Sequence, residues 1–562
     1  MNSNVSEENF IVSYIKSLNY KDLIIFLIPF AIFIYFLHVY DPGILNGDAY
    51  NQLHQITTNQ FTNWHPFFHT FIERTCLEIF PTPLSVGIFQ ITLFSAMWTI
   101  ICKYNRNSDK FDKFFILQVI ITLIIALIPI NAIYSISLDK DTLFSYFLMF
   151  LCFLIQVMVN KKGNIGFSFA LLMSITMAFV SQIRPNGMIM IIIFLVLLAI
   201  YLYKNFKTNK MYLIIPILTI TCILLISSLN IVYDVENTQK DAILDKTSHM
   251  LSYYDLNVDV SDADKEKIYQ LISKDTINNN FDIHYTDPTY FHVLNHTAYK
   301  NDKMGYVSMV IKYTLQNPIK FMEYLFESSP IVWDITRDDD WEGYAYYTDY
   351  SLARNNFYNE HKDYKPENPQ IDNASSKNMG TAEYNTVDSY VNAFTENHVL
   401  DTLFNSPALY MYLSFILLGM MYFITRSKDM LLIYVPNLIN ILTVMISIPI
   451  QSNRYLYSNL VVFYLLLIIF IGILSKNGFK IPHKSMPISN NPDKNDYVPQ
   501  ENIYGEMNYN EPIEIMHNNE DNDDLSLLYD EILSGNSPQE ETIEEMEARI
   551  RAKILKEYED DK

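Results

Sequence analysis

Long apolar runs separated by short polar clusters occupy most of the chain up to Ser475. Each run approaches the roughly 20 residues that an α-helix needs to cross a bilayer. None shows the two-residue alternation of a barrel strand, and lipid cannot satisfy an open backbone, so we expect helices. The pattern predicts about ten transmembrane helices, over residues 23–40, 86–102, 114–130, 142–159, 165–180, 187–203, 211–232, 407–425, 430–448 and 459–475.

The composition agrees with a multi-pass membrane protein. The chain has 562 residues, of which 50% are hydrophobic and 14% aromatic, and this is too long and too apolar for one soluble domain. Its net charge of -22 comes mainly from acidic residues outside the apolar runs, in the long loop and in the tail. The charge therefore predicts no nucleic-acid partner.

The basic residues set the expected orientation. The first run follows Lys16 and Lys21 and has no small-residue cleavage site after it, which predicts an anchor with a cytoplasmic N-terminus. Every inner loop then holds two or more basic residues, as the positive-inside rule requires. A re-entrant segment at 165–180 would invert this pattern, so we expect that run to cross. The chain is predicted to lie in the cell membrane with both termini cytoplasmic.

Four regions follow from these spans. Residues 1–232 form a transmembrane module with a long first outer loop, 41–85. Residues 233–406 are polar and rich in Tyr, and they predict a folded extracytoplasmic domain of mixed structure. Residues 407–475 add the last spans, and 476–562 read as an acidic, largely disordered cytoplasmic tail. Within the outer segment, residues 306–325 have helical spacing and predict one helix, either on the membrane or packed on the domain.

Polar clusters of the loops gather on the outer side by alternation of the spans. Basic residues kept on that side, against the positive-inside bias, invite a chemical explanation. The clusters are 41–55, Asn63-Trp64-His65-Pro66, Asp139-Lys140-Asp141, Arg184-Pro185-Asn186-Gly187 and Gln451-Ser452-Asn453-Arg454.

The first outer loop is dense in groups that can accept a proton, among them Asp41, Asp48 and His65. A partly desolvated carboxylate at the edge of the bilayer suits a general base acting on a hydroxyl, and we take these three residues as catalytic candidates. Two structural alternatives stay open. Asp48 could cap a helix over residues 49–58, and Asp41 could serve the turn that Asp-Pro-Gly favours.

Trp64 places an indole beside His65, an arrangement that suits either sugar stacking or anchoring at the membrane interface. Asp139 and Asp141 could ligate a hard divalent cation such as Mg²⁺ or Mn²⁺, while Lys140 between them could meet a phosphate. The alternative for this triplet is a self-neutralising loop cap.

Arg184 and Arg454 each place a permanent cation near the depth of the lipid headgroups. Contact with a lipid phosphate explains both the sign and the depth of these charges. The alternative is that the two side chains extend to the interface without a specific partner.

The arrangement resembles the GT-C superfamily of integral-membrane glycosyltransferases, which use polyprenyl-phosphate-linked sugars. The resemblance covers residues 23–232 and, more weakly, the last span. It rests on the long first outer loop with Asp48 in Asn46-Gly47-Asp48-Ala49-Tyr50, on the pair Lys140-Asp141, and on the large outer segment after seven spans. The Asp-Glu pair of protein mannosyltransferases and the Trp-Trp-Asp-Tyr-Gly signature of oligosaccharyltransferases do not occur at the matching places, so no donor sugar follows.

The resemblance implies an inverting transfer at the outer face. Asp48 would be the base toward an acceptor hydroxyl of a glycan, lipid or protein, and Lys140, Arg184 and Arg454 would contact the phosphate of the lipid donor. Membrane lipids would be further partners. Two alternatives remain: a transporter or flippase of lipid-linked glycans, which should carry ionisable residues in mid-span, and a non-catalytic envelope scaffold.

Overall fold

The computed structural model describes residues 17–106, 113–205, 210–237, 242–286, 294–336, 378–447 and 451–476. All of them belong to one compact unit, Met1–Lys484. The predicted tail, 476–562, lies outside the described residues apart from Lys476. Within the described ranges the regular structure is helical, and β-pairing is confined to isolated bridges.

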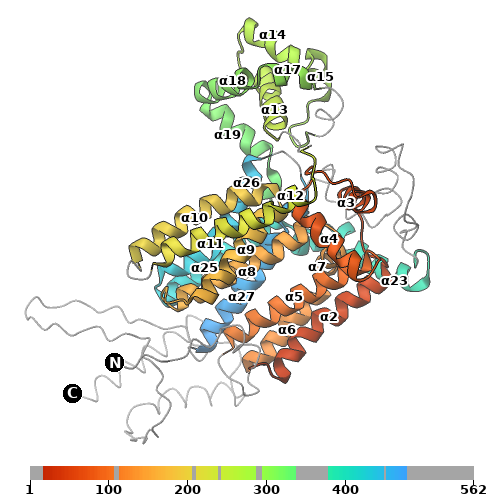
Figure 1. Ribbon diagram of the computed structural model, residues 1–562, viewed down its shortest axis with the longest axis vertical. Helices are drawn as coiled ribbons and strands as arrows, with labels where there is room; N and C mark the ends of the chain where they lie inside the picture. Colours follow the sequence, from red (N-terminus) through yellow and green to blue (C-terminus); the bar gives the residue numbers. More distant parts are fainter. Residues whose placement is uncertain are drawn as a thin grey trace, which may run out of the picture. The chain divides into compact units, whose positions relative to one another are not determined.

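Among the described residues, eight helical segments are long and apolar enough to cross a membrane, as expected of an all-α membrane protein. Figure 1 shows most of them running side by side in one bundle. The eight are α2 (Tyr20–Val39), α5 (Leu84–Asn105), α8 (Lys140–Asn160), α10 (Pro185–Asn205), α11 (Met211–Ser227) with α12 (Leu229–Val232), α25 (Pro407–Thr425), η1 (Lys428–Tyr434) with α26 (Val435–Ile446), and η2 (Asn453–Leu456) with α27 (Tyr457–Lys476).

The other two predicted runs also form helices but differ from simple spans. The run at 114–130 breaks into α6 (Lys113–Leu127) and α7 (Pro129–Ile136), which meet at 66°. Ile128 precedes Pro129 and is extended, as the proline ring requires of its neighbour. The run at 165–180 forms α9 (Phe167–Ile183), which packs along α8, α10 and α11.

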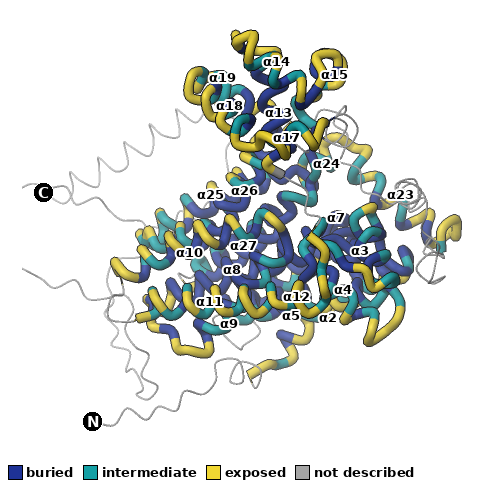
Figure 2. Tube along the Cα trace, turned by 45° about the horizontal axis from the view of Figure 1, so that its top comes forward, coloured by how far each residue is buried: buried dark blue, intermediate teal, exposed yellow. Residues whose placement is uncertain are grey.

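The bundle is built around α8. All its residues from Lys140 to Val159 are buried, so a helix that is apolar nearly all round occupies the centre. Helices α9 and α27 pack directly against it, while α10 and α11 lie farther out and expose many apolar side chains. Figure 2 shows this contrast between the buried centre and the exposed outer helices.

Two shorter helices cover one end of the bundle, which we call the site end. They are α3 (Gly47–Thr58) and α4 (Phe67–Ile79), both from the predicted first outer loop. Helix α4 packs on α5 and α9. Helices α23 (Ala382–Glu396) and α24 (His398–Asn405) lead into α25, and α23 packs on α2 and α7.

A second helical group with its own apolar core follows α12. Every regular element described in it is a helix, whereas the sequence predicted mixed structure. Its elements are α13 (Ala242–Asn257), α14 (Asp262–Leu271), α15 (Lys274–Asn280), α17 (His296–Asn301), α18 (Lys303–Gln316) and α19 (Pro318–Glu327). The short helix α20 (Pro330–Trp333) follows and packs on α25 and α26 of the bundle. The single helix predicted at 306–325 is wrong, because Pro318 begins a new helix after a break at Asn317.

Candidate functional site

The site starts at the N-terminus of α3. The side chain of Asn46 accepts a hydrogen bond from the backbone N–H of Ala49 (2.8 Å), so Asn46 is the N-cap. The alternative in which Asp48 caps this helix is therefore wrong. Asp48 lies in the first turn instead, and its carboxylate is free to turn toward α8.

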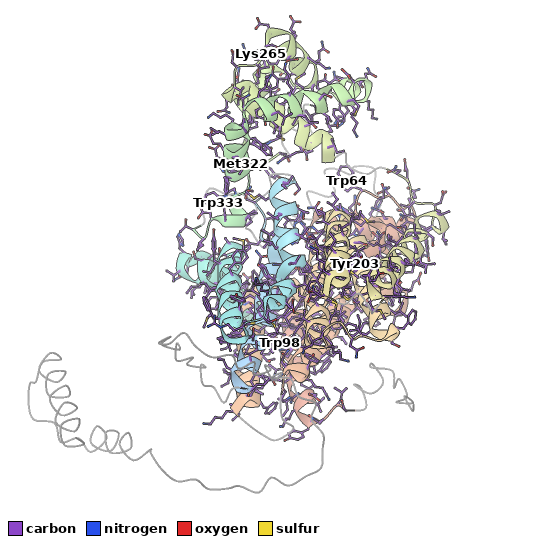
Figure 3. All side chains as sticks on the ribbon, turned by 90° about the vertical axis from the view of Figure 1, so that its left-hand side faces the viewer. Trp64, Trp98, Tyr203, Lys265, Met322 and Trp333 are labelled. Carbon is purple, nitrogen blue, oxygen red and sulfur yellow. The ribbon has the colours of Figure 1, made fainter. Side chains whose placement is uncertain are left out.

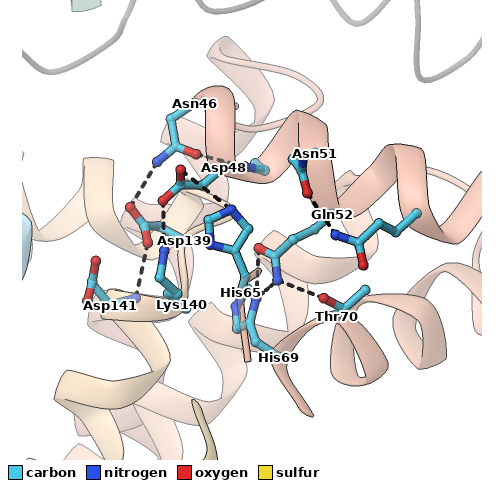
Figure 4. A network of polar contacts seen from close by, with 12 residues as sticks. Asn46, Asp48, Asn51, Gln52, His65, His69, Thr70, Asp139, Lys140 and Asp141 are labelled. Carbon is cyan, nitrogen blue, oxygen red and sulfur yellow. Dashed lines mark hydrogen bonds and ion pairs between the residues drawn. The ribbon is translucent and has the colours of Figure 1, made fainter. Parts of the chain in front are cut away.

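The start of α8 meets this turn. Asp139 caps α8 by accepting from the N–H of Asp141 (3.1 Å), which agrees with the capping alternative for that acid. Its other oxygen, Oδ2, accepts from Asn46 Nδ2 (2.9 Å) and so fastens α3 to α8. Lys140 Nζ then donates to Asp48 Oδ2 at 2.7 Å. Figure 4 shows these contacts together.

Arg454 reaches the same carboxylates from the start of η2. Its Nη1 donates to Asp48 Oδ2 (3.2 Å) and to Asp139 Oδ2 (3.1 Å), and its Nε lies 3.9 Å from Asp141 Oδ2. Two cations, Lys140 and Arg454, thus hold a single oxygen of Asp48 between them.

Arg184, directly after α9, completes the arrangement from inside. Its Nε lies 3.1 Å from Asp141 Oδ1, an ion pair without aligned hydrogen-bond geometry. Its Nη1 donates to the backbone carbonyl of Tyr455 at 2.8 Å. The Tyr455 ring lies 4.8 Å from the Arg184 guanidinium and 5.0 Å from that of Arg454, so it contacts both cations.

We call these six charged residues the ion-pair cluster: Asp48, Asp139, Lys140, Asp141, Arg184 and Arg454. Three carboxylates face three cations, so the charges of the cluster balance. This pairing offsets the free-energy cost of removing each charged group from water. Asp48 and Arg454 are its open edge, with side chains 28% and 24% exposed, while the other four are buried. A ligand would reach the cluster there.

Charge pairing controls ionisation at this edge. Burial opposes ionisation of Asp48, but Lys140, His65 and Arg454 together hold its pKa well below the usual value. Burial also opposes ionisation of Asp139, yet Arg454 and Lys140 lower its pKa to about 2. Burial lowers the pKa of His65 to about 4, so its imidazole is neutral at pH 7. A neutral His65 Nε2 therefore lies 3.7 Å from an ionised Asp48.

Several buried polar side chains of α3 and α4 lie behind His65. Gln52 donates to Thr70 Oγ1 (2.9 Å), and its amide also lies within hydrogen-bond distance of His69 Nδ1. Glu73 Oε1 is 3.8 Å from that nitrogen. Burial lowers the pKa of His69 to about 3 and raises that of Glu73 well above its usual value. Burial therefore favours the neutral form of both side chains.

Two of the predicted site residues lie apart from this arrangement. Asp41 sits in the turn after α2, where Gly43 N–H donates to the Tyr40 carbonyl at 2.7 Å, as Asp-Pro-Gly predicted. Trp64 packs against the apolar core of the α13–α19 group and joins that group to the loop that carries His65.

The predicted metal ligands do not fit a metal ion. Asp139 and Asp141 lie against Arg454 and Arg184, so cations of the protein itself already occupy the space beside them. Across the described ranges, no three His, Cys, Asp or Glu side chains are grouped to hold a metal.

Sequence reasoning missed two residues that build the site. Asn46 both caps α3 and fastens Asp139, and its position just before Gly47-Asp48 is a recognisable capping signal. Tyr455 directly follows Arg454 in the sequence, and its backbone and ring both hold Arg184. The sequence contains no signal for this role of Tyr455, because it depends on how α9 and η2 pack.

Comparisons with known proteins add a family. No curated protein and no solved structure matches the chain. A family model described as "Family of unknown function (DUF6020)" matches residues 53–480, which include every residue of the ion-pair cluster except Asp48. Because this match covers well over half of the sequence, the chain belongs to the DUF6020 family.

Proposed function

We propose that this protein is a membrane glycosyltransferase that transfers a sugar from a polyprenyl-phosphate carrier to an acceptor hydroxyl at the outer face of the membrane. The observation that carries the proposal is Asp48 Oδ2, an anionic oxygen held by Lys140 and Arg454 at the open edge of the cluster. A base and two phosphate-binding cations therefore meet at one point, where the spanning helices end. The resemblance to GT-C enzymes supports the same chemistry.

Binding of the donor would exchange partners within the cluster. A phosphate oxygen placed where Asp48 Oδ2 now lies would meet the same two cations. Arginine and lysine both stabilise negative charge on phosphate, and that charge grows as the sugar–phosphate bond breaks. Arg184 would act indirectly, since it holds Asp141 and Tyr455 beside Arg454.

The same exchange would activate the base. Paired with two cations, Asp48 is a weak base because its pKa lies well below the usual range. A donor phosphate that took over Lys140 and Arg454 would leave Asp48 next to neutral His65, and its affinity for a proton would rise. The acceptor oxygen would then form a bond to the anomeric carbon as its proton passes to Asp48. The bond from that carbon to the phosphate oxygen breaks, polyprenyl phosphate leaves, and the configuration inverts.

The distribution of charge favours an enzyme over a transporter. In the described spans, Asp, Glu, Lys and Arg occur only near the helix ends. The polar contacts within the bundle are between amides and hydroxyls, such as Asn437 with Asn459 (2.9 Å) and Asn440 with Ser458 (3.1 Å). Transport of an anionic headgroup would call for cations along the path, and these are absent from the described mid-span positions.

The test is sugar transfer by purified full-length protein, with radiolabelled polyprenyl-phosphate sugars as donors and membrane extract as acceptor. Asp48→Asn should bind the donor and transfer no label. Asp41→Asn is the matched control, because it alters a carboxylate of the same loop that lies in a separate turn, and it should retain transfer. Equal transfer by wild type and Asp48→Asn would refute the base assignment.

A further inference from the structure

Helices α18 and α19 carry an apolar stripe that the described part of the chain leaves exposed. It consists of Ile311, Leu315, Ile319, Met322, Phe326 and, after the short helix α20 begins, Trp333. Ile311 and Leu315 are four residues apart on α18, and Ile319, Met322 and Phe326 are three or four apart on α19, so each helix presents its members on one face. Leu315 and Ile319 are 76% and 74% exposed, which is unusual for large aliphatic side chains.

The fold of the helical group does not need this stripe. On α18, the opposite face contributes Tyr306, Met309 and Tyr313 to the core of the group. On α19, Tyr324 and Leu325 serve the same core. Each helix therefore has a second apolar face beyond the one that stabilises the fold.

The stripe continues into the lipid-facing surface of a spanning helix. Trp333 Nε1 donates to the Phe326 carbonyl (2.9 Å), and the Trp333 carbonyl accepts from Tyr412 Oη (2.9 Å). Tyr412 lies five residues after Pro407, where α25 begins, so the end of the stripe is hydrogen-bonded to the beginning of that span. Tyr412, Phe415 and Ile416 of α25 are themselves exposed.

The figures agree with this path. Helix α19 leads from the helical group toward α26 (Figure 1), and the labelled Met322 and Trp333 lie along that descent (Figure 3). Trp is the residue type enriched at the boundary between headgroups and hydrocarbon. An amphipathic helix at that depth buries its apolar face in the boundary region and leaves its charged flank in water.

We propose that α18 and α19 rest on the membrane surface, with this stripe inserted among the lipids of the leaflet at the site end. The helical group is then held against the bilayer at the site end. Trp64 also joins this group to the loop that carries His65, and Gln451, three residues before Arg454, donates to the backbone of His284 and Ser328. This inference does not depend on glycosyl transfer.

The test places an environment-sensitive probe on each face of α19. Ile319→Cys and, as the matched control, Lys320→Cys are made in a Cys222→Ala background, since the other three cysteines are buried. Lys320 is half-exposed on the charged flank, where it pairs with Glu323 (2.6 Å). Full-length protein labelled with a nitrobenzoxadiazole maleimide is reconstituted in nanodiscs with and without doxyl-labelled lipids.

The expected result is quenching at position 319, with fluorescence at least about twofold lower in doxyl lipids, and little change at position 320. A probe at 319 in a dry environment that doxyl lipids do not quench would mean that protein covers the stripe, either another part of this chain or a second copy. A probe at 319 in water, or equal quenching at both positions, would also overturn the proposal.

Discussion

Arg184 and Asp141 face each other in the interior of the site end, where neither side chain is exposed. Removal of one partner from a buried ion pair leaves an uncompensated charge, which is far more destabilising than loss of an exposed pair. We expect Arg184→Met to lower the free energy of unfolding by about 3 kcal/mol. Lys320→Met, which removes the exposed pair with Glu323, should change it by less than about 1 kcal/mol.

Thermal unfolding in detergent measures this difference. Equal effects of Arg184→Met and Lys320→Met would contradict the buried ion pair. Donor binding is a separate readout, and it should weaken in Arg184→Met because Arg184 holds Tyr455 against Arg454.

His65 makes the stability of the protein depend on pH, and the sign of this dependence follows from the burial of its imidazole. The pKa of His65 is about 4 in the folded protein and near 6.5 in an unfolded chain, so the folded state favours the neutral ring. Its contribution to stability is complete above pH 6.5 and is lost as the pH falls toward 4. Between pH 7 and pH 5 we expect a loss on the order of 2 kcal/mol from this imidazole.

The measurement is the unfolding midpoint at pH 7 and at pH 5 for wild type and His65→Gln. The midpoint of His65→Gln should fall less on acidification, because His69 and His249 still titrate but His65 does not. The same pH dependence in both proteins would show that His65 is not held neutral by burial.

At the scale of elements, α3 is positioned by the side-chain amide of Asn46, whose oxygen and nitrogen each make one hydrogen bond. Asn46 caps α3 and donates to Asp139. Asn46→Ala should lower stability by about 1 kcal/mol and also lower sugar transfer, because Asp48 is then less well fixed against α8. Ser261→Ala removes a comparable N-cap from α14, where the Asp264 N–H is the donor, and should leave transfer unchanged.

Unfolding and transfer assays on the same preparations separate these effects. Normal transfer by Asn46→Ala would show that the link from α3 to α8 does not position the base.

A comparison of predicted and observed helices shows which structural features can be predicted from the sequence. All ten predicted runs coincide with helices, because apolar length is a local property that packing does not erase. The breaks at Ile128-Pro129 and Asn317-Pro318 were missed, although proline marks both. The expectation that 165–180 is no re-entrant loop is supported, since Arg184 at the end of α9 meets Asp141 at the start of α8.

At the scale of the whole molecule, the cluster depends on contacts between distant parts of the chain. Arg454 and Asp48 are 406 positions apart, and Lys140 and Asp48 are 92 apart. Alternation of spans predicted that these residues share one end of the bundle. It could not predict which of them touch, because that depends on the packing of α8, α9 and α27 around one another.

The orientation of the bundle stays a prediction, and it is testable from the two ends. Gln60 follows α3 at the site end, and Lys161 follows α8 at the opposite end; both are exposed. With the cytoplasmic termini that the basic loops predict, Gln60→Cys should react with an impermeant maleimide in intact cells and Lys161→Cys should not. The reverse pattern of labelling would place the site in the cytoplasm.

The most direct measurement of the central claim is the fate of a labelled sugar in sealed vesicles that contain the purified protein. Radiolabelled polyprenyl-phosphate sugars are supplied in the bilayer, with membrane extract as acceptor, to wild type and Asp48→Asn. A transferase moves label into the acceptor fraction with wild type and leaves it on the lipid with Asp48→Asn. Label that crosses the vesicle membrane on an intact lipid, with none in the acceptor, would contradict the enzyme and establish a flippase.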